Sequence, residues 1–158
     1  MEELTYKQAT LSDYDDFYKI KCDPENVKWS GFASAPDYER MKEWFCKQLD
    51  SEKRTIYIAY WNGVACGFFY LDKVTEEEFE AASSGVLKEF TGRGIGSAII
   101  HYATEVSNAF VLCAWVSDKN RASERCFEKN GFDKLAAKEQ RMMSSGNALH
   151  DFLLGKSD

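Results

Sequence analysis

Apolar and polar positions follow one another along the chain in patterns that predict alternating strands and helices. Residues 4–9 predict a first strand, and the apolar positions of 11–20 recur at helical spacing. Residues 22–35 carry Pro, Gly and small polar residues, which predict an irregular segment. A second helix is expected over 36–49, since Pro is well tolerated in a first helical turn.

The clearest local signal is a β-hairpin over residues 55–72. Two β-rich runs flank Asn62-Gly63, the residue pair that best tolerates the positive φ angles of a type I′ turn. The acidic segment 73–80 is expected to be mobile. Residues 81–87 then predict a further strand, which leads directly into a glycine-rich loop.

The second half of the chain predicts a helix behind that loop and then a strand over 109–116. This strand is apolar throughout, as expected where both faces are covered. A helix follows, opened by Asn120 and closed by Gly131, with Phe132 packing back on Phe127. Two last strands are expected near 132–137 and 148–154. The predicted order is βααβββαβαββ, a mixed α/β sheet.

Composition adds limits to this outline. With 158 residues, 44% hydrophobic and 15% aromatic, the chain can bury one core, so residues 1–158 are expected to form a single domain. A net charge of −6 disfavours binding to nucleic acid. Five cysteines without a CxxC spacing indicate free thiols in a reducing cytoplasm, and no metal is expected. No signal peptide or long apolar run indicates a membrane.

The segment 88–103, "KEFTGRGIGSAIIHYA", places three glycines where a helix must begin. It could be a plain strand-to-helix turn, because glycine permits tight geometry. Alternatively, its N–H groups could hold a phosphate, with the helix dipole adding to the attraction. The nucleotide P-loop requires a Lys that is missing here, and "GRGIGS" lacks the third glycine of the dinucleotide fingerprint.

A third phosphate-binding pattern fits better. The loop resembles the acyl-CoA pyrophosphate loop of the GNAT N-acetyltransferase superfamily, (Q/R)xxGx(G/A), with Thr91 in the first position and Gly94 and Gly96 in the small ones. The segment "NRASERCFEKNGF" is similar to the superfamily's second block, and its "NxxSxR" opening to the subgroup that acetylates ribosomal-protein N-termini and polyamines. The expected order of elements matches that of the superfamily over nearly the whole chain.

The resemblance implies that acetyl-CoA binds where the central sheet is splayed between its fourth and fifth strands, at 81–87 and 109–116. The sequence departs from the superfamily pattern at two positions. Thr91 lacks the usual long side chain, and Phe127 stands where many relatives carry a Tyr that protonates the departing thiolate. The implied cofactor-binding residues are Val86 and Leu87 for the pantetheine arm, Thr91, Gly92, Arg93, Gly94, Ile95, Gly96 and Ser97 for the pyrophosphate, and Asn120 and Phe127 beside the strands.

The activity implied by the resemblance is direct transfer of an acetyl group from acetyl-CoA to a primary amine of a small molecule or a protein N-terminus. Relatives often carry the general base as a Glu on the strand before the loop, so the resemblance makes Glu80 the first candidate to relay the amine proton and Glu78 the second, although an acidic run is also typical of a solvated surface. The acidic balance favours a cationic acceptor. The alternative is a catalytically degenerate CoA-binding or sensing protein, motivated by Thr91 and Phe127. Members of the superfamily often pair, so a homodimer is one expected assembly.

Overall fold

The computed structural model describes residues 3–30, 32–117, 119–134, 141–142 and 148–155. Within these residues the strands form one mixed sheet in the order β1-β2-β3-β4-β5-β8-β6, with β7 paired to β8. The strands are β1 (Leu4–Gln8), β2 (Arg54–Trp61), β3 (Val64–Lys73), β4 (Glu78–Val86), β5 (Val111–Ser117), β6 (Asp133–Lys134), β7 (Arg141–Met142) and β8 (Ala148–Gly155). The α-helices are α1 (Tyr14–Lys21), α2 (Pro24–Trp29), α3 (Tyr38–Leu49), α4 (Ile95–Ser107) and α5 (Arg121–Lys129), with 3₁₀ turns at Leu11–Asp13 and Lys88–Phe90.

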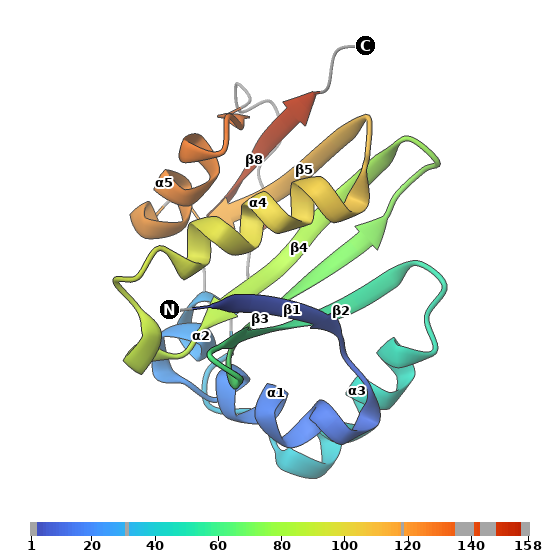
Figure 1. Cartoon of the computed structure of the whole chain (residues 1–158), viewed down its shortest axis with the longest axis vertical. Helices are drawn as coiled ribbons and strands as arrows, with labels where there is room; N and C mark the ends of the chain where they lie inside the picture. Colours follow the sequence, from blue (N-terminus) through green and yellow to red (C-terminus); the bar gives the residue numbers. More distant parts are fainter. Residues whose placement is uncertain (1–2, 31, 118, 135–140, 143–147, 156–158) are drawn as a thin grey trace.

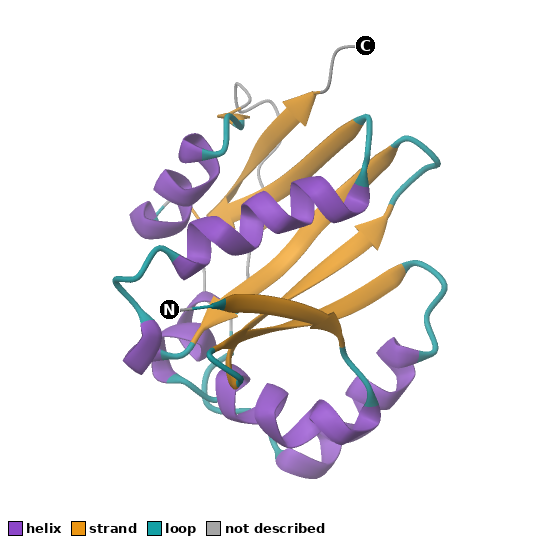
Figure 2. Ribbon diagram, in the orientation of Figure 1, coloured by secondary structure: helices purple, strands orange, loops and turns teal. Residues whose placement is uncertain are grey.

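Helices cover the two faces of the sheet and bury a separate apolar cluster on each (Figures 1 and 2). On one face α1 and α3 bury Phe17 and Phe45, both fully inaccessible to solvent, against Phe68 of β3. On the other face α4 and α5 bury Ile99 and Phe127. Burying a side chain of this size stabilises the fold by about 1.5–3 kcal/mol. The mixed α/β class expected from the sequence is confirmed, with β4 and β5 parallel.

Several predicted local features are confirmed. Asn62 and Gly63 have φ angles of 49° and 83°, as a type I′ turn between β2 and β3 requires. At the end of α5 the Phe132 N–H donates to the Phe127 carbonyl at 3.1 Å, and the two rings meet edge-on with centroids 5.0 Å apart. Strand β5 lies inside the sheet between β4 and β8, as its apolar sequence predicts.

Two predictions for the first half of the chain are wrong in part. The segment 22–35 is not irregular throughout, since it contains α2, which begins with Pro24 and is capped by Asp23 accepting from the Glu25 N–H at 3.2 Å. Helix α3 begins at Tyr38 rather than Pro36, because Asp37 acts as its N-cap. Asp23 followed by Pro24, and Asp37 alone, are typical helix-start signals. The many small residues between them favoured the interpretation as an irregular segment.

The acidic segment expected to be mobile is partly a strand. Strand β4 begins at Glu78, and its first residues pair with β3 on one side and with β5 on the other. Pairing on both sides satisfies the backbone and outweighs the low strand preference of Glu. Near the C-terminus β6 covers Asp133–Lys134 of the strand expected over 132–137, and 135–137 lie outside the described residues.

Candidate active site

The sheet opens between β4 and β5. The two parallel strands pair only over their first three positions, and the last of these pairs joins Glu80 to Cys113. On its other edge β4 is bulged, because Tyr70 of β3 lies opposite Ser83 and Leu71 opposite Ala81, which leaves Ala82 unmatched. A bulge bends its strand and increases the local twist. Beyond Glu80 the strands therefore diverge.

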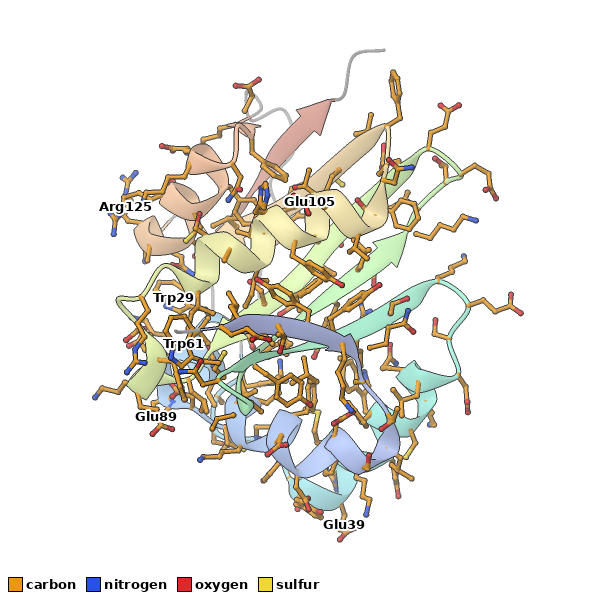
Figure 3. The ribbon with its side chains drawn as sticks, viewed as in Figure 1. Trp29, Glu39, Trp61, Glu89, Glu105 and Arg125 are labelled. Atoms are coloured by element: carbon orange, nitrogen blue, oxygen red, sulfur yellow. The ribbon has the colours of Figure 1, made fainter. Side chains whose placement is uncertain are left out.

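A small cavity of about 90 Å³ lies in this opening, and we call it the inter-strand cavity. Residues 81–84 of β4 and 115–117 of β5 line it, together with Ile99 of α4 and with Asn120 and Phe127 at α5. Helix α5 is amphipathic. Its Phe127 side faces the inter-strand cavity, and Arg125 points away into solvent (Figure 3). Asn120 also caps α5, its side chain accepting from the Ser123 N–H at 3.2 Å.

The backbone of β4 is only partly free to pair with a ligand in the opening. The Leu87 N–H donates to the Cys66 carbonyl of β3 at 2.8 Å, so this group is already engaged. Along an antiparallel strand, the backbone N–H and C=O groups of every second residue point to the same neighbouring strand. Because Leu87 points to β3, the backbone groups of Ser84 and Val86 point away from it. The Val86 carbonyl accepts from the Asn26 side chain at 3.2 Å.

The glycine-rich loop places the start of α4 beside the same opening. Gly92 and Gly94 have φ angles of 79° and 78°, a left-handed backbone that favours glycine. Gly94 is the N-cap of α4, and none of the described side chains caps this helix start. Its first N–H groups therefore have no partner within the helix, as at any helix N-terminus, and carry the positive end of its dipole.

The remaining loop residues have different environments. Ile95 is buried and anchors the start of α4, and Ser97 accepts from the Asn130 side chain at 3.2 Å. The Thr91 hydroxyl donates to the Lys88 carbonyl at 2.7 Å. Arg93 is exposed, and its guanidinium lies 5.5 Å from the centre of the Trp61 ring. Trp61 is the last residue of β2 and is labelled in Figure 3. Gly96 faces α5, since a Cβ there would lie 3.4 Å from the Cys126 sulfur.

A second and larger cavity of about 870 Å³ lies on the other side of β4, and we call it the outer cavity. Its walls are rich in aromatic rings, contributed by Trp29, Phe32, Trp44, Tyr70 and Trp115. Trp29, Ala82, Ser83 and Trp115 line both cavities, so the two meet at the bulge of β4. These four residues therefore form a wall common to the two cavities.

Glu80 lies at the junction of these features. It lines the outer cavity and occupies the last position at which β4 is still paired with β5. The structure thus brings the candidate base to the mouth of the opening, together with Asn120 and Phe127 inside it and the glycine-rich loop beside it. Of the sequence-predicted residues, Glu80 lines the outer cavity and Asn120 and Phe127 line the inter-strand cavity, whereas Val86, Leu87 and residues 91–97 line neither of the two.

Sequence reasoning missed Lys21, which lines the outer cavity and is 4% exposed. Its ammonium donates to the Ser30 hydroxyl at 3.2 Å and lies 5.2 Å from the centres of the Phe32 and Phe68 rings. Burial, and to a smaller extent the nearby charge of Arg54, lowers the pKa of Lys21 to about 8. Helical spacing places positions 14, 17 and 21 on one face, but the burial of a charged side chain at position 21 depends on rings from distant parts of the chain.

Two features are absent from the described residues. No helix in the described ranges is long and apolar enough to cross a membrane. No group of three or more His, Cys, Asp or Glu side chains in those ranges is arranged to hold a metal ion.

A mixed sheet that opens between two parallel strands, with a glycine-rich helix start at the opening, is the fold of an acyl-CoA-dependent N-acetyltransferase. Residues 14–132 match the model of the Acetyltransferase (GNAT) family. The chain belongs to this family. The resemblance stated from the two sequence blocks is thereby confirmed.

Solved structures agree with this assignment of the fold. A spermidine N-acetyltransferase from Vibrio cholerae, in complex with CoA and spermine, is 13% identical with a TM-score of 0.82, covering 96% of this chain and 95% of that chain. The aminoglycoside acetyltransferase AAC(6')-Ib with coenzyme A is 19% identical with a TM-score of 0.81, covering 98% and 95%. A ribosomal-protein-alanine N-acetyltransferase from Brucella melitensis is 18% identical with a TM-score of 0.79, covering 96% and 99%. No curated protein matches the sequence significantly.

Proposed function

We propose that this acetyltransferase transfers the acetyl group of acetyl-CoA directly to a primary amine of a small molecule or a protein N-terminus. The observation that carries the proposal is the meeting of two cavities at the bulge of β4. The donor would enter through the inter-strand cavity and the acceptor through the outer cavity. A direct reaction needs the two substrates held in contact, and holding them so supplies much of the rate.

The donor site would use the residues around the opening. The N–H groups of the loop from Thr91 to Ser97 would bind the pyrophosphate, with Gly92, Arg93, Gly94, Ile95 and Gly96 forming the rest of the loop. The β4 backbone near Val86 and Leu87 would follow the pantetheine arm, with the Leu87 N–H already engaged by β3. Asn120 and Phe127 would lie beside the thioester end. Because Thr91 already donates to Lys88, backbone amides would carry most of the phosphate affinity.

The reaction would proceed in one ternary complex. The neutral amine attacks the thioester carbonyl, a C–N bond forms, and the C–S bond breaks as CoA leaves as a thiolate. The proton lost by the amine would pass to Glu80, directly or through a water molecule. Phe127 cannot donate a proton to the thiolate, but a thiol with a pKa of about 8.5 is a tolerable leaving group without such help.

A thiol-release assay with a panel of amines tests the proposal. The panel contains polyamines, aminoglycosides, amino acids, amino sugars and peptides with free N-termini, and calorimetry measures CoA binding in parallel. We expect CoA binding together with thiol release for at least one amine class. Tight acetyl-CoA binding without release for any amine would instead favour the catalytically degenerate CoA sensor. Absence of CoA binding would contradict both alternatives.

The cellular setting follows from the same chemistry. All five cysteines are free, which suits the reducing cytoplasm in which we expect the enzyme to work. Acetyl-CoA would be a co-substrate, and we propose no resident metal and no nucleic-acid partner for this acidic chain. Sedimentation of the purified protein would test the expected homodimer.

A further inference from the structure

The outer cavity contains a buried positive charge that no described carboxylate neutralises. Lys21 is 4% exposed and forms no ion pair with any described Asp or Glu, and among the described residues its ammonium donates only to the neutral Ser30 hydroxyl, at 3.2 Å. Aromatic rings face the ammonium at 5.2–5.8 Å and offset part of its desolvation. An ammonium has three N–H donors, so donors remain for a further acceptor.

The hydroxyl of Tyr70 gives a second, independent sign of a missing partner. Tyr70 is 4% exposed, lines the same cavity, and its hydroxyl is buried without a hydrogen-bond partner in the described part of the chain. Its ring centre lies 5.8 Å from the Lys21 ammonium. A buried hydroxyl without a partner costs about 1–3 kcal/mol, so such groups are rare unless a ligand satisfies them.

None of the described neighbouring charges neutralises the buried Lys21 ammonium. The Arg54 guanidinium lies 4.7 Å from the Tyr70 ring centre, but two hydrogen bonds of 2.7 and 2.8 Å pair it with Asp72. Its charge is therefore balanced within the protein. Asp37 and Glu80 also line the cavity, but neither forms an ion pair with Lys21 in the described ranges, and Arg40, another lining residue, adds further positive charge. Within the described ranges, no carboxylate therefore balances the positive charge on Lys21.

We propose that Lys21 and Tyr70 form an oxyanion-binding subsite in the outer cavity, and that the acceptor is an amine that also carries a carboxylate. This inference rests on the proposed function, which places the acceptor in that cavity. The carboxylate would accept from the ammonium and from the phenol, and the amine would lie toward Glu80 at the bulge of β4. The aromatic walls would bind an apolar body between the two ends. A polycationic acceptor would instead place like charge against Lys21.

Turnover measurements with matched amines test the subsite. Each amino acid of a panel is compared with the amine that lacks only its carboxylate, for example phenylalanine with phenethylamine. We expect kcat/KM to favour the carboxylate-bearing member by about tenfold to hundredfold, the range for a hydrogen bond between charged groups. Lys21→Met should abolish this preference and Lys21→Arg should retain part of it. Tyr70→Phe should reduce the preference without loss of thermal stability.

Matched controls separate the subsite from folding and from overall charge. Lys19→Met removes a charge from the same helix, at a side chain that is 69% exposed, and should leave the preference unchanged. Thermal unfolding of Lys21→Met checks that the fold is retained, because Met fills similar space among the rings. Equal or better turnover of the amines without carboxylate would overturn the inference while leaving the proposed function intact.

A binding experiment decides the question even if no amine is turned over. Benzoate and benzamide are titrated into the protein, followed by the NMR signals of the outer-cavity tryptophans. Saturable benzoate binding that benzamide does not reproduce and that Lys21→Met weakens at least tenfold would support the subsite. Equal binding of both probes, absence of benzoate binding, or the same affinity in Lys21→Met would refute it. Absence of thiol release with intact CoA binding would contradict only the proposed function.

Discussion

Substitution of Gly94 by Asp tests the assignment of the glycine-rich loop most directly. Gly94 lies at the start of α4 with a φ angle of 78°, and a Cβ at this position would meet no atom within 4 Å. A side chain there would therefore add backbone strain without a steric clash. Asn and Asp both tolerate the left-handed region better than other residues. Gly94→Asn is then a matched control that differs from Gly94→Asp only in charge.

The size of the effect follows from the charge. At a separation of about 5 Å, one unit charge repels another by about 0.8 kcal/mol in water and about 3 kcal/mol at an effective dielectric constant of 20. A CoA pyrophosphate bound to the loop amides would meet this repulsion. We expect Gly94→Asp to raise the dissociation constant of CoA by about fivefold to over a hundredfold relative to Gly94→Asn.

Calorimetric titration of CoA into the two variants and the unsubstituted protein measures this difference. Repeating the titrations at higher salt should reduce the difference between Asp and Asn, because ions screen charges at an exposed loop. Thermal unfolding without CoA should give similar stability for the two variants. Equal CoA affinity for Asp and Asn would remove the loop from the phosphate site and refute the reasoning.

Three further predictions concern single side chains. Glu80→Gln should lower kcat at neutral pH and flatten the acidic limb of the pH–rate profile, while the matched Glu78→Gln should not; an unchanged profile would reject Glu80 as the base. Phe127→Tyr should raise kcat or leave it nearly unchanged, whereas a large fall in melting temperature would show that the contact with Phe132 decides this position. Burial raises the pKa of Asp13, but hydrogen bonds from Thr10, Lys7 and Tyr60 lower it below its ordinary value. Asp13 should therefore stabilise the fold above about pH 4 and lose this effect as the pH falls, so Asp13→Asn should cost about 1–3 kcal/mol at pH 7 and less in acid, as measured by urea unfolding.

Short-range patterns predicted the parts of the fold that local chemistry determines. The hairpin at Asn62-Gly63 and the ending of α5 at Gly131 depend on backbone conformations that few residues adopt, so a residue pair or a single glycine was sufficient. The loop before α4 was found in the same way. The residues assigned to it from the sequence also lie together in the structure, since they are contiguous.

Features that depend on distant contacts could not be predicted. Lys21 is a charged residue in a helix, and its burial is decided by Phe32, Phe68 and Tyr70, which come from separate parts of the chain. The bulge at Ala82 depends on how β3 and β4 pair, and the alternation of side chains along one strand does not reveal it. The outer cavity is built from such contacts, so the acceptor side was the part of the site least accessible to sequence reasoning.

The small residues of β4 explain why α2, which the sequence did not predict, belongs to the site. A Cβ at Gly85 would lie 2.8 Å from the side chain of Asn26 in α2, so only glycine allows this helix to approach the strand so closely. Asn26 then donates to the Ile20 and Val86 carbonyls, at 2.8 and 3.2 Å, and ties α2 to both α1 and β4. Since Trp29 lies one turn further along α2 and lines both cavities, the packing at Gly85 positions the wall that donor and acceptor would share.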